Sequence, residues 1–332
     1  MRSFLLIISF LFAIQPAFSQ YTEVINANHP GASEGAFSVG RDVLQLETGF
    51  NFGQEKHSLL DTETVNYGVD YTLRYGLLSE RLELRWTGEF RASDITEKQF
   101  EPQRQQQISN FTSNVIGIKY LVYDPHIARD LKGPNLYSWR ANNTFQWRDL
   151  IPAVSLFAGL NLDLDDLNPY LPPNTSAISP KVVLSTQNNF KGGWVLVTNI
   201  IGDRLANEFP SYSYIVTLTH YVGNAVSIFA ENQGIMSDFY ADQLIRGGGA
   251  ILLGRDFQID ISATYSFKDT PSILYGRLGF AYRFDMHSQD EYLEEMEPSK
   301  SIEERKELKK GRQKNKNDND TPEELEMGGD EN

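Results

Sequence analysis

The sequence predicts an all-β fold, a transmembrane antiparallel β-barrel of about 12 strands (roughly 10–14). Three observations predict this fold: strict alternation of apolar and charged residues, an export signal, and a complete lack of cysteine. In residues 81–91 charged side chains occupy one parity, and Leu82, Leu84, Trp86 and Phe90 occupy the other. A period of two places these sets on opposite faces of a strand. Since the charged face is too polar for a dry core, a barrel with lipid outside and a wet or ion-paired lumen accommodates both.

The N-terminal segment predicts a cleaved secretory signal over residues 1–19. Arg2 supplies a positive start, Phe4–Ile14 form a short apolar run, and Pro16–Ser19 end in a small-x-small cleavage pattern. Gln20 is therefore the expected first mature residue. A membrane anchor is excluded because a spanning helix needs about 20 apolar residues. Export without a lipoprotein cysteine or a disulfide indicates the outer membrane of a Gram-negative cell.

Twelve alternating stretches follow over residues 42–285. They are preceded by a polar segment at 20–41, which we expect at the periplasmic mouth or inside the lumen. Long polar connections alternate with short turns such as Leu78–Glu80 and Lys191–Gly193, as in barrels whose long loops lie outside the cell. Segment 124–151 interrupts the pattern and leaves room for another hairpin. The expected strands cover residues 42–53, 64–76, 81–91, 112–123, 152–163, 181–190, 194–202, 211–221, 225–234, 244–253, 256–266 and 273–284.

Charge and composition change after Phe284. Residues 286–332 are rich in Glu, Lys, Asp and Asn and nearly devoid of aliphatic side chains, which predicts a disordered periplasmic tail. A solvated tail is favoured over a dedicated binding segment. The whole chain carries a net charge of −14 and has no basic stripe, which argues against nucleic acid as a partner.

Charged side chains on the inner face of the predicted strands are the candidate functional residues. They could form a charged constriction that sorts solutes, as rings of charged residues do in pores. They could instead form a ladder of cross-strand pairs that fills the lumen. Their mixed signs slightly favour the ladder. The candidates are Asp70, Arg74, Arg81, Glu83, Arg85, Glu89, Arg91, Lys119, Asp260, Arg277 and Arg283.

No motif in the sequence predicts a metal site, a cofactor or a catalytic centre. The acidic run 163–168 lacks the central glycine and terminal glutamate of an EF-hand loop. His220 follows Ser211 and Ser213 closely in the sequence, but no nucleophile elbow or oxyanion-hole pattern accompanies them. A histidine in the aromatic girdle at a strand end explains His220 better. We therefore expect no enzyme, no metal and no cofactor.

Two stretches resemble the outer-membrane barrels of the meta-pathway phenol-degradation transporter family, common in Bacteroidetes. Residues Ile25–Val39 (INANHPGASEGAFSV), followed by Leu44–Glu47 (LQLE), are similar to the segment that leads into that family's first strand. Asn28-His29 stands where the family usually carries Asp-Arg. The stretch Gly117–Tyr120 (GIKY) is similar to a recurring strand of the family. The resemblance covers roughly residues 25–285 and implies an outer-membrane barrel that passes small molecules.

These observations predict an outer-membrane channel that passes small solutes, including aromatic or amphiphilic ones, by passive diffusion through a charged lumen. Barrels of eight strands leave room only for side chains, whereas sixteen to eighteen leave an open channel, so twelve strands are intermediate. The alternative is a closed structural or adhesive barrel that acts through its loops or tail, and an outer-membrane hydrolase ranks third. Expected partners are outer-membrane lipids, the barrel-insertion machinery and a small-molecule solute. The closing strand, Gly276–Phe284, is expected to pair with Leu44–Phe52 because a barrel in lipid leaves no free edge.

Overall fold

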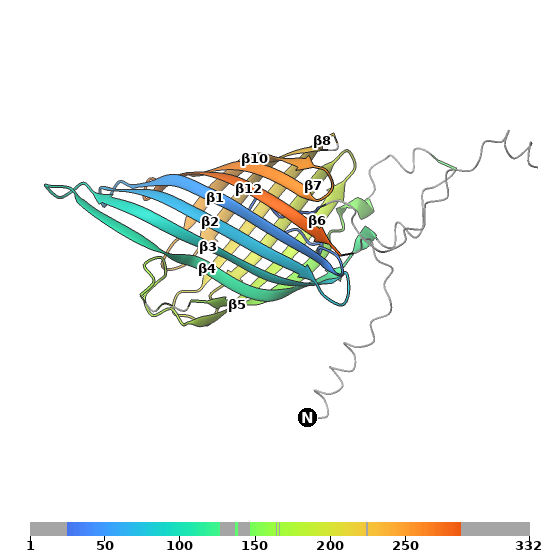
Figure 1. Cartoon of the computed structure of the whole chain (residues 1–332), viewed down its shortest axis with the longest axis horizontal. Coiled ribbons are helices and arrows are strands. Elements are labelled where there is room, and N and C mark those ends of the chain that lie inside the picture. The colour runs from blue at the N-terminus through green and yellow to red at the C-terminus, as the bar shows by residue number, and fades with distance from the viewer. Residues whose placement is uncertain are drawn as a thin grey trace, which may run out of the picture. The chain divides into compact units, whose positions relative to one another are not determined.

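Twelve antiparallel strands close into one barrel, in which each strand pairs with its neighbours along the chain (Figure 1). This computed structural model describes residues 25–126, 137–138, 147–163, 165, 167–223 and 225–286. The expected signal segment, and the expected tail beyond Met286, lie outside the described residues. The strands are β1 (Val43–His57), β2 (Thr62–Gly76), β3 (Leu82–Glu97), β4 (Arg104–Tyr123), β5 (Ala153–Leu162), β6 (Ile178–Phe190), β7 (Trp194–Asp203), β8 (Ser211–Val222), β9 (Val226–Met236), β10 (Asp242–Leu253), β11 (Phe257–Ser266) and β12 (Ser272–Asp285).

The barrel closes where the first strand meets the last. β1 and β12 run antiparallel, with Leu44 opposite Phe284 and Phe52 opposite Gly276, as the sequence predicts. Closure gives the backbone amides and carbonyls of both strands partners on either side. This matters in lipid, where an unpaired backbone group has no water to replace its partner.

Alternate residues of the strands face lipid and lumen, which produces the alternation in the sequence. On β1 the side chains of Gln45 and Glu47 are buried inside, whereas Leu46 is 40% exposed and Phe50 is 54% exposed on the outside. Burying apolar side chains against hydrocarbon, rather than water, is what makes such an outer face stable. The chain is therefore built as an outer-membrane barrel.

The strands on one side of the barrel are longer than the sequence predicts. The expected loop at 92–110 is mostly paired hairpin, since β3 continues to Glu97 and β4 begins at Arg104. The expected loop at 54–63 also shortens to a tight turn between β1 and β2. Figure 1 shows the β3–β4 hairpin extending beyond its neighbours. The prediction failed here because these outer ends carry polar residues on both faces, so they show no alternation.

Among its described residues, the connection between β4 and β5 includes the short 3-10 helix Trp147–Leu150, and Pro125 and His126 are also helical. The additional hairpin considered for 124–151 falls mainly on residues 127–136 and 139–146, which lie outside the described part of the chain. None of the described residues belongs to a helix long and apolar enough to cross a membrane.

Candidate functional site

Residues 25–41, called the lumen segment below, lie inside the barrel. Backbone amides of this segment donate hydrogen bonds to inward side chains of β1, β3, β6, β7 and β9. Because these strands are distributed around the barrel, a segment that contacts all of them must occupy the lumen. The bonds run from the amide of Asn28 to Glu47 (3.2 Å), of Ala32 to Glu231 (3.0 Å), of Glu34 to Asn199 (2.7 Å), of Ala36 to Gln187 (3.0 Å) and of Val39 to Glu83 (3.1 Å).

Carbonyl groups of the lumen segment bind cations and amides of the wall. Arg74 donates to the carbonyl of Asn26 at 2.8 Å and to that of Phe37 at 3.3 Å. Lys119 also donates to the Phe37 carbonyl, at 2.7 Å. The candidate residues Arg74 and Lys119 therefore serve, at least in part, to hold a segment of this chain.

A glycine allows the closest approach between the lumen segment and the wall. A Cβ atom added at Gly31 would lie 2.6 Å from Oε2 of Glu231. The same carboxylate accepts hydrogen bonds from the amides of Ala32 and Ser33 and from Thr217, and it pairs with Arg246 of β10. The His-Pro-Gly-Ala-Ser stretch thus brings consecutive backbone amides onto one buried carboxylate.

The part of the wall next to the β2–β3 turn carries a buried group of ion pairs. Arg74 lies between Glu47 at 3.1 Å and Glu83 at 2.9 Å, and all three side chains are 0% exposed. Lys119 lies 3.8 Å from Glu83. Removing such charges from water is costly unless each is paired and hydrogen-bonded. The pairs and the carbonyls of the lumen segment together meet this requirement.

Arg85 joins the wall to the lumen segment directly. Its guanidinium lies 2.6 Å from the carboxylate of Glu34 and 3.9 Å from the ring centroid of Phe157 on β5. Burial by itself raises the pKa of Glu34, but the positive charges of Arg85, Lys181 and Lys119 together outweigh burial, so this pKa lies below its usual value. Glu34 is therefore an ionised anchor of the segment.

A second group of charges lies beside His29. Arg277 of β12 bridges Asp70 of β2, at 2.8 Å, and Asp260 of β11, at 2.5 Å. The Nε2 atom of His29 lies 3.6 Å from both Glu47 and Asp70. The carbonyl of His29 accepts a hydrogen bond from Gln258 at 2.9 Å, which fixes the backbone at this position.

Charged side chains of the wall that lie nearer the β1–β2 and β3–β4 hairpins are more accessible to solvent. Arg91 lies 2.9 Å from Glu89 and 3.9 Å from Glu55, and these three side chains are 25–27% exposed. The rings of Tyr170 and Tyr275 flank Arg91, with centroids 6.0 Å and 5.7 Å from its guanidinium carbon. A solute entering from this side would meet these groups before it reached the lumen segment.

Two candidate residues differ from the rest. Arg81 lies in the turn before β3, half-buried, and its side chain makes no ion pair with any residue that the structure describes; only its carbonyl is bonded, to the amide of Leu121. The strand begins one residue later than the sequence predicts, so Arg81 precedes β3, and its place in the lining of the lumen stays a prediction. Arg283 is buried near the inner end of β12 and lies 3.5 Å from Asp285.

Sequence reasoning missed Glu34, His29 and Glu231 as site residues. Glu34 and His29 belong to a segment without periodicity, so nothing in the sequence shows which wall residues they contact. Glu231 lies on the inner face of β9 together with Phe229, which is also buried. This apolar neighbour weakens the alternation that would have revealed the carboxylate.

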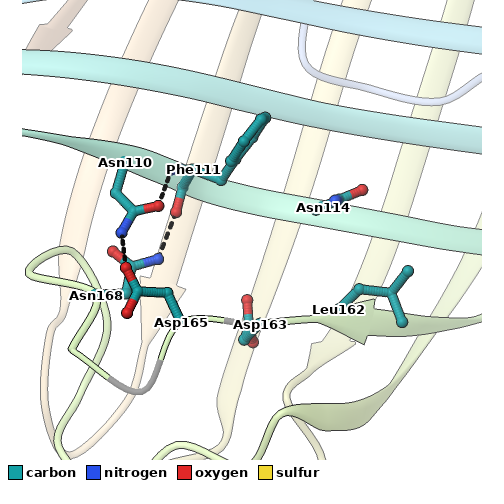
Figure 2. Close-up of a pocket in the computed structure, with 7 residues that line it drawn as sticks. All are labelled: Asn110, Phe111, Asn114, Leu162, Asp163, Asp165 and Asn168. Atoms are coloured by element: carbon teal, nitrogen blue, oxygen red, sulfur yellow. Dashed lines mark hydrogen bonds between the residues drawn. The ribbon is translucent and has the colours of Figure 1, made fainter.

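A pocket of about 230 Å³ lies where β5 ends and β4 continues, paired with β3 but without a strand on its other side. Side chains of the following loop replace the missing strand there. Asn168 donates to the carbonyl of Phe111 at 2.7 Å, and Asn110 donates to Asp165 at 2.6 Å (Figure 2). Among the described residues no group of three or more His, Cys, Asp or Glu could hold a metal ion, and Asp163 in the acidic run pairs with Arg204.

The arrangement on β8 gives no support to a hydrolase. Ser211 and Ser213 lie at one end of the strand and His220 lies towards the other. His220 lies seven positions after Ser213 along the strand, a span of about 23 Å at the usual rise per residue. The His220 ring stacks on Trp194 with centroids 4.2 Å apart.

Comparison with known proteins identifies a family. A family profile described as "Putative MetA-pathway of phenol degradation" matches residues 27–284. No curated protein is significantly similar to the chain in sequence.

Several solved structures are similar to this chain at low sequence identity. An outer-membrane channel from Pseudomonas putida F1 is 10% identical, covering 78% of this chain and 100% of that chain, with a TM-score of 0.49. The β domain of the Bordetella autotransporter BrkA is 10% identical, covering 73% of this chain and 100% of that chain, with a TM-score of 0.45. The CymD monoaromatic hydrocarbon channel is 9% identical, covering 74% of this chain and 89% of that chain, with a TM-score of 0.40. None is similar enough to assign a substrate to this chain.

Proposed function

The chain belongs to this phenol-degradation family, and we propose that it is an outer-membrane channel through which small solutes diffuse passively. Aromatic or amphiphilic solutes are part of the proposal, because the family description concerns phenol degradation. We place the channel in the outer membrane of a Bacteroidetes cell, where it contacts lipids and where the insertion machinery acts on β12. We assign it no catalytic role.

One observation supports the proposal: a segment that is not part of the wall, residues 25–41, occupies the lumen. The lumen segment is attached to the barrel covalently only through its junction with β1, and it is held otherwise by hydrogen bonds and ion pairs. Such contacts can break and re-form without unfolding the barrel. The ring of charged wall side chains would then line the path, as in other selective pores.

Deleting residues 25–38 from the full-length chain tests this function. The refolded barrel should keep its heat-resistant migration on a gel, because no strand is removed. Conductance in planar bilayers and the swelling rate of solute-loaded liposomes should both rise above those of the intact chain. An equal conductance for both proteins would show that the segment does not obstruct the lumen.

The alternative function is a closed structural or adhesive barrel that acts through its loops. The buried ion pairs of Arg74, Glu47 and Glu83 favour it, because a lumen filled by paired side chains needs no solute path. The same deletion separates the two functions. A barrel that remains folded but carries no current after loss of the segment supports the closed alternative and contradicts the channel.

A further inference from the structure

Arg85 differs from the other inward-facing cations of the barrel in the place of its counter-ion. Among the described residues, the carboxylate of Glu34 is the one carboxylate within 4 Å of the Arg85 guanidinium, and Glu34 belongs to the lumen segment. The other cations on the inner face of the described strands pair with carboxylates of the strands or their connections: Arg74, Arg91, Lys119, Lys181, Arg246, Arg277 and Arg283. Arg85 therefore depends for its counter-ion on a segment that is not part of the wall.

The guanidinium of Arg85 has more donors than Glu34 uses. Its Nη1 atom lies 2.6 Å from the Glu34 carboxylate. Its Nε and Nη2 atoms are buried and make no hydrogen bond within the described part of the chain. A guanidinium binds a free carboxylate through two parallel N–H groups, which is stronger than a single contact. Glu34 is thus an incomplete ligand of this cation, and a buried cation without a partner is costly.

An apolar group of four inward side chains adjoins this cation. The guanidinium carbon of Arg85 lies 3.9 Å from the ring centroid of Phe157. The Phe157 ring lies against the wall over two glycines, since a Cβ atom at Gly117 or Gly159 would lie 2.6 or 2.7 Å from its Cζ atom. The lumen of a membrane barrel is usually polar, so a cation beside apolar side chains is a distinct feature there. The group comprises Val115 of β4, Phe157 of β5, Val183 of β6 and Ile201 of β7.

We propose that Arg85 and this apolar group form a binding site for small amphipathic carboxylates, and that Glu34 occupies the site until such a solute displaces it. The carboxylate of the solute pairs with Arg85, and its apolar body lies on Phe157 and the adjoining aliphatic side chains. Arg85 is only 2% exposed while the lumen segment is docked, so binding of the solute and docking of the segment exclude each other. This inference rests on the proposed channel function and names a class of solute for it.

Calorimetric titration of the full-length chain in a non-ionic detergent at neutral pH tests the site, with benzoate as the probe. Benzamide has the same ring without the charge, and acetate has the charge without the ring. Benzoate should bind saturably, and the other two should each bind at least about tenfold more weakly, because each lacks one of the two kinds of contact. Equal binding of benzamide would overturn the recognition of a carboxylate. Equal binding of acetate would overturn the role of the apolar group.

Substitutions separate the cation of the site from the carboxylate that occupies it. Arg85→Gln should abolish benzoate binding. Glu34→Gln should lower the dissociation constant of benzoate by about fivefold or more, because the competing carboxylate is removed and the accessible state is more populated. Arg104→Gln, at an exposed arginine of β4, is the matched control and should leave that constant unchanged. If Arg85→Gln does not fold, Glu34→Gln decides: an unchanged dissociation constant there would overturn the proposal.

Arg91 is the competing position for the site, because the rings of Tyr170 and Tyr275 flank its guanidinium. Arg91 nevertheless keeps Glu89 of its own strand as a counter-ion when the lumen segment leaves. Benzoate binding that is lost in Arg91→Gln and retained in Arg85→Gln would overturn the assignment to Arg85.

Thiol labelling measures displacement of the lumen segment, because the chain contains no native cysteine. Ala36→Cys places a thiol where the side chain is 0% exposed in the docked segment, and Leu59→Cys, at a position that is 81% exposed, serves as reference. Saturating benzoate should raise the ratio of the two labelling rates by about fivefold or more, and benzamide should not. A ratio that benzoate leaves unchanged would overturn the displacement of Glu34.

Conductance recorded in parallel keeps this inference separate from the channel function. A protein that binds benzoate and shows the labelling change, but carries no current even without residues 25–38, would contradict the channel and support the binding site. A protein that conducts, but binds no benzoate either as the wild type or as Glu34→Gln, would contradict the binding site and support the channel.

Discussion

Replacing Arg74 by methionine should destabilise the barrel strongly. Arg74 is 0% exposed and lies between Glu47 and Glu83, which are also 0% exposed. Methionine preserves much of the apolar stem and removes the charge, so two buried carboxylates lose their shared cation. Breaking a buried pair by removing one partner costs about 3–5 kcal/mol. The same substitution also removes the hydrogen bonds to the carbonyls of Asn26 and Phe37.

Equilibrium unfolding in urea, with the protein inserted in phospholipid vesicles, measures this cost as a loss in the free energy of unfolding. Arg104→Met is the matched control, because Arg104 is exposed at the outer end of β4, and it should change that free energy by less than about 0.5 kcal/mol. The double variant Arg74→Met/Glu83→Gln should recover part of the loss, because one of the two buried charges is then neutralised.

A loss below about 1 kcal/mol for Arg74→Met would refute the reasoning. It would mean that water reaches Glu47 and Glu83 well enough to replace the guanidinium, as at an exposed ion pair. A double variant that is less stable than Arg74→Met would contradict the charge argument as well.

Two further predictions concern the lumen segment and the lipid face. Because the pKa of Glu34 is held below its usual value beside Arg85, this ion pair stabilises docking of the lumen segment above about pH 4 and loses that effect as the pH falls through the folded-state pKa. Thiol labelling of Ala36→Cys, at a position that is 0% exposed in the docked segment, should therefore become faster in strong acid relative to labelling of Leu59→Cys, which is 81% exposed. Glu34→Gln should remove this acid-induced increase, and an increase that persists in Glu34→Gln would contradict the role of the ion pair. Leu278→Lys, at a lipid-facing position 40% exposed, should cost about 2–4 kcal/mol of unfolding free energy in vesicles if it lies near mid-membrane. A negligible cost would contradict the outward orientation of this residue.

Much of the barrel is predictable because lipid imposes a simple rule on the sequence. Leu274, Leu278 and Tyr282 must face hydrocarbon, whereas Arg277 and Arg283 must not, so β12 shows its alternation plainly. In the polar hairpin that joins β3 and β4 the sequence shows no such alternation, so the predicted β3 ends too early and the predicted β4 begins too late.

The contacts of the lumen were not predictable in the same way. Alternation places Arg74, Glu83 and Lys119 on the inner face, but it does not show that they meet one another or the carbonyl of Phe37. The pairing of Glu34 with Arg85 joins an irregular segment to a strand. Such contacts depend on how the segment folds back into the barrel, and one sequence contains no pattern for that.

The position of the lumen segment bears on how the barrel is assembled. The segment precedes β1 in the chain, yet its binding partners lie on β1, β3, β6, β7 and β9, and pairing of β12 with β1 closes the ring that holds them around it. The complete set of these contacts therefore requires a closed barrel, and a barrel with a missing or misaligned strand cannot form all of them.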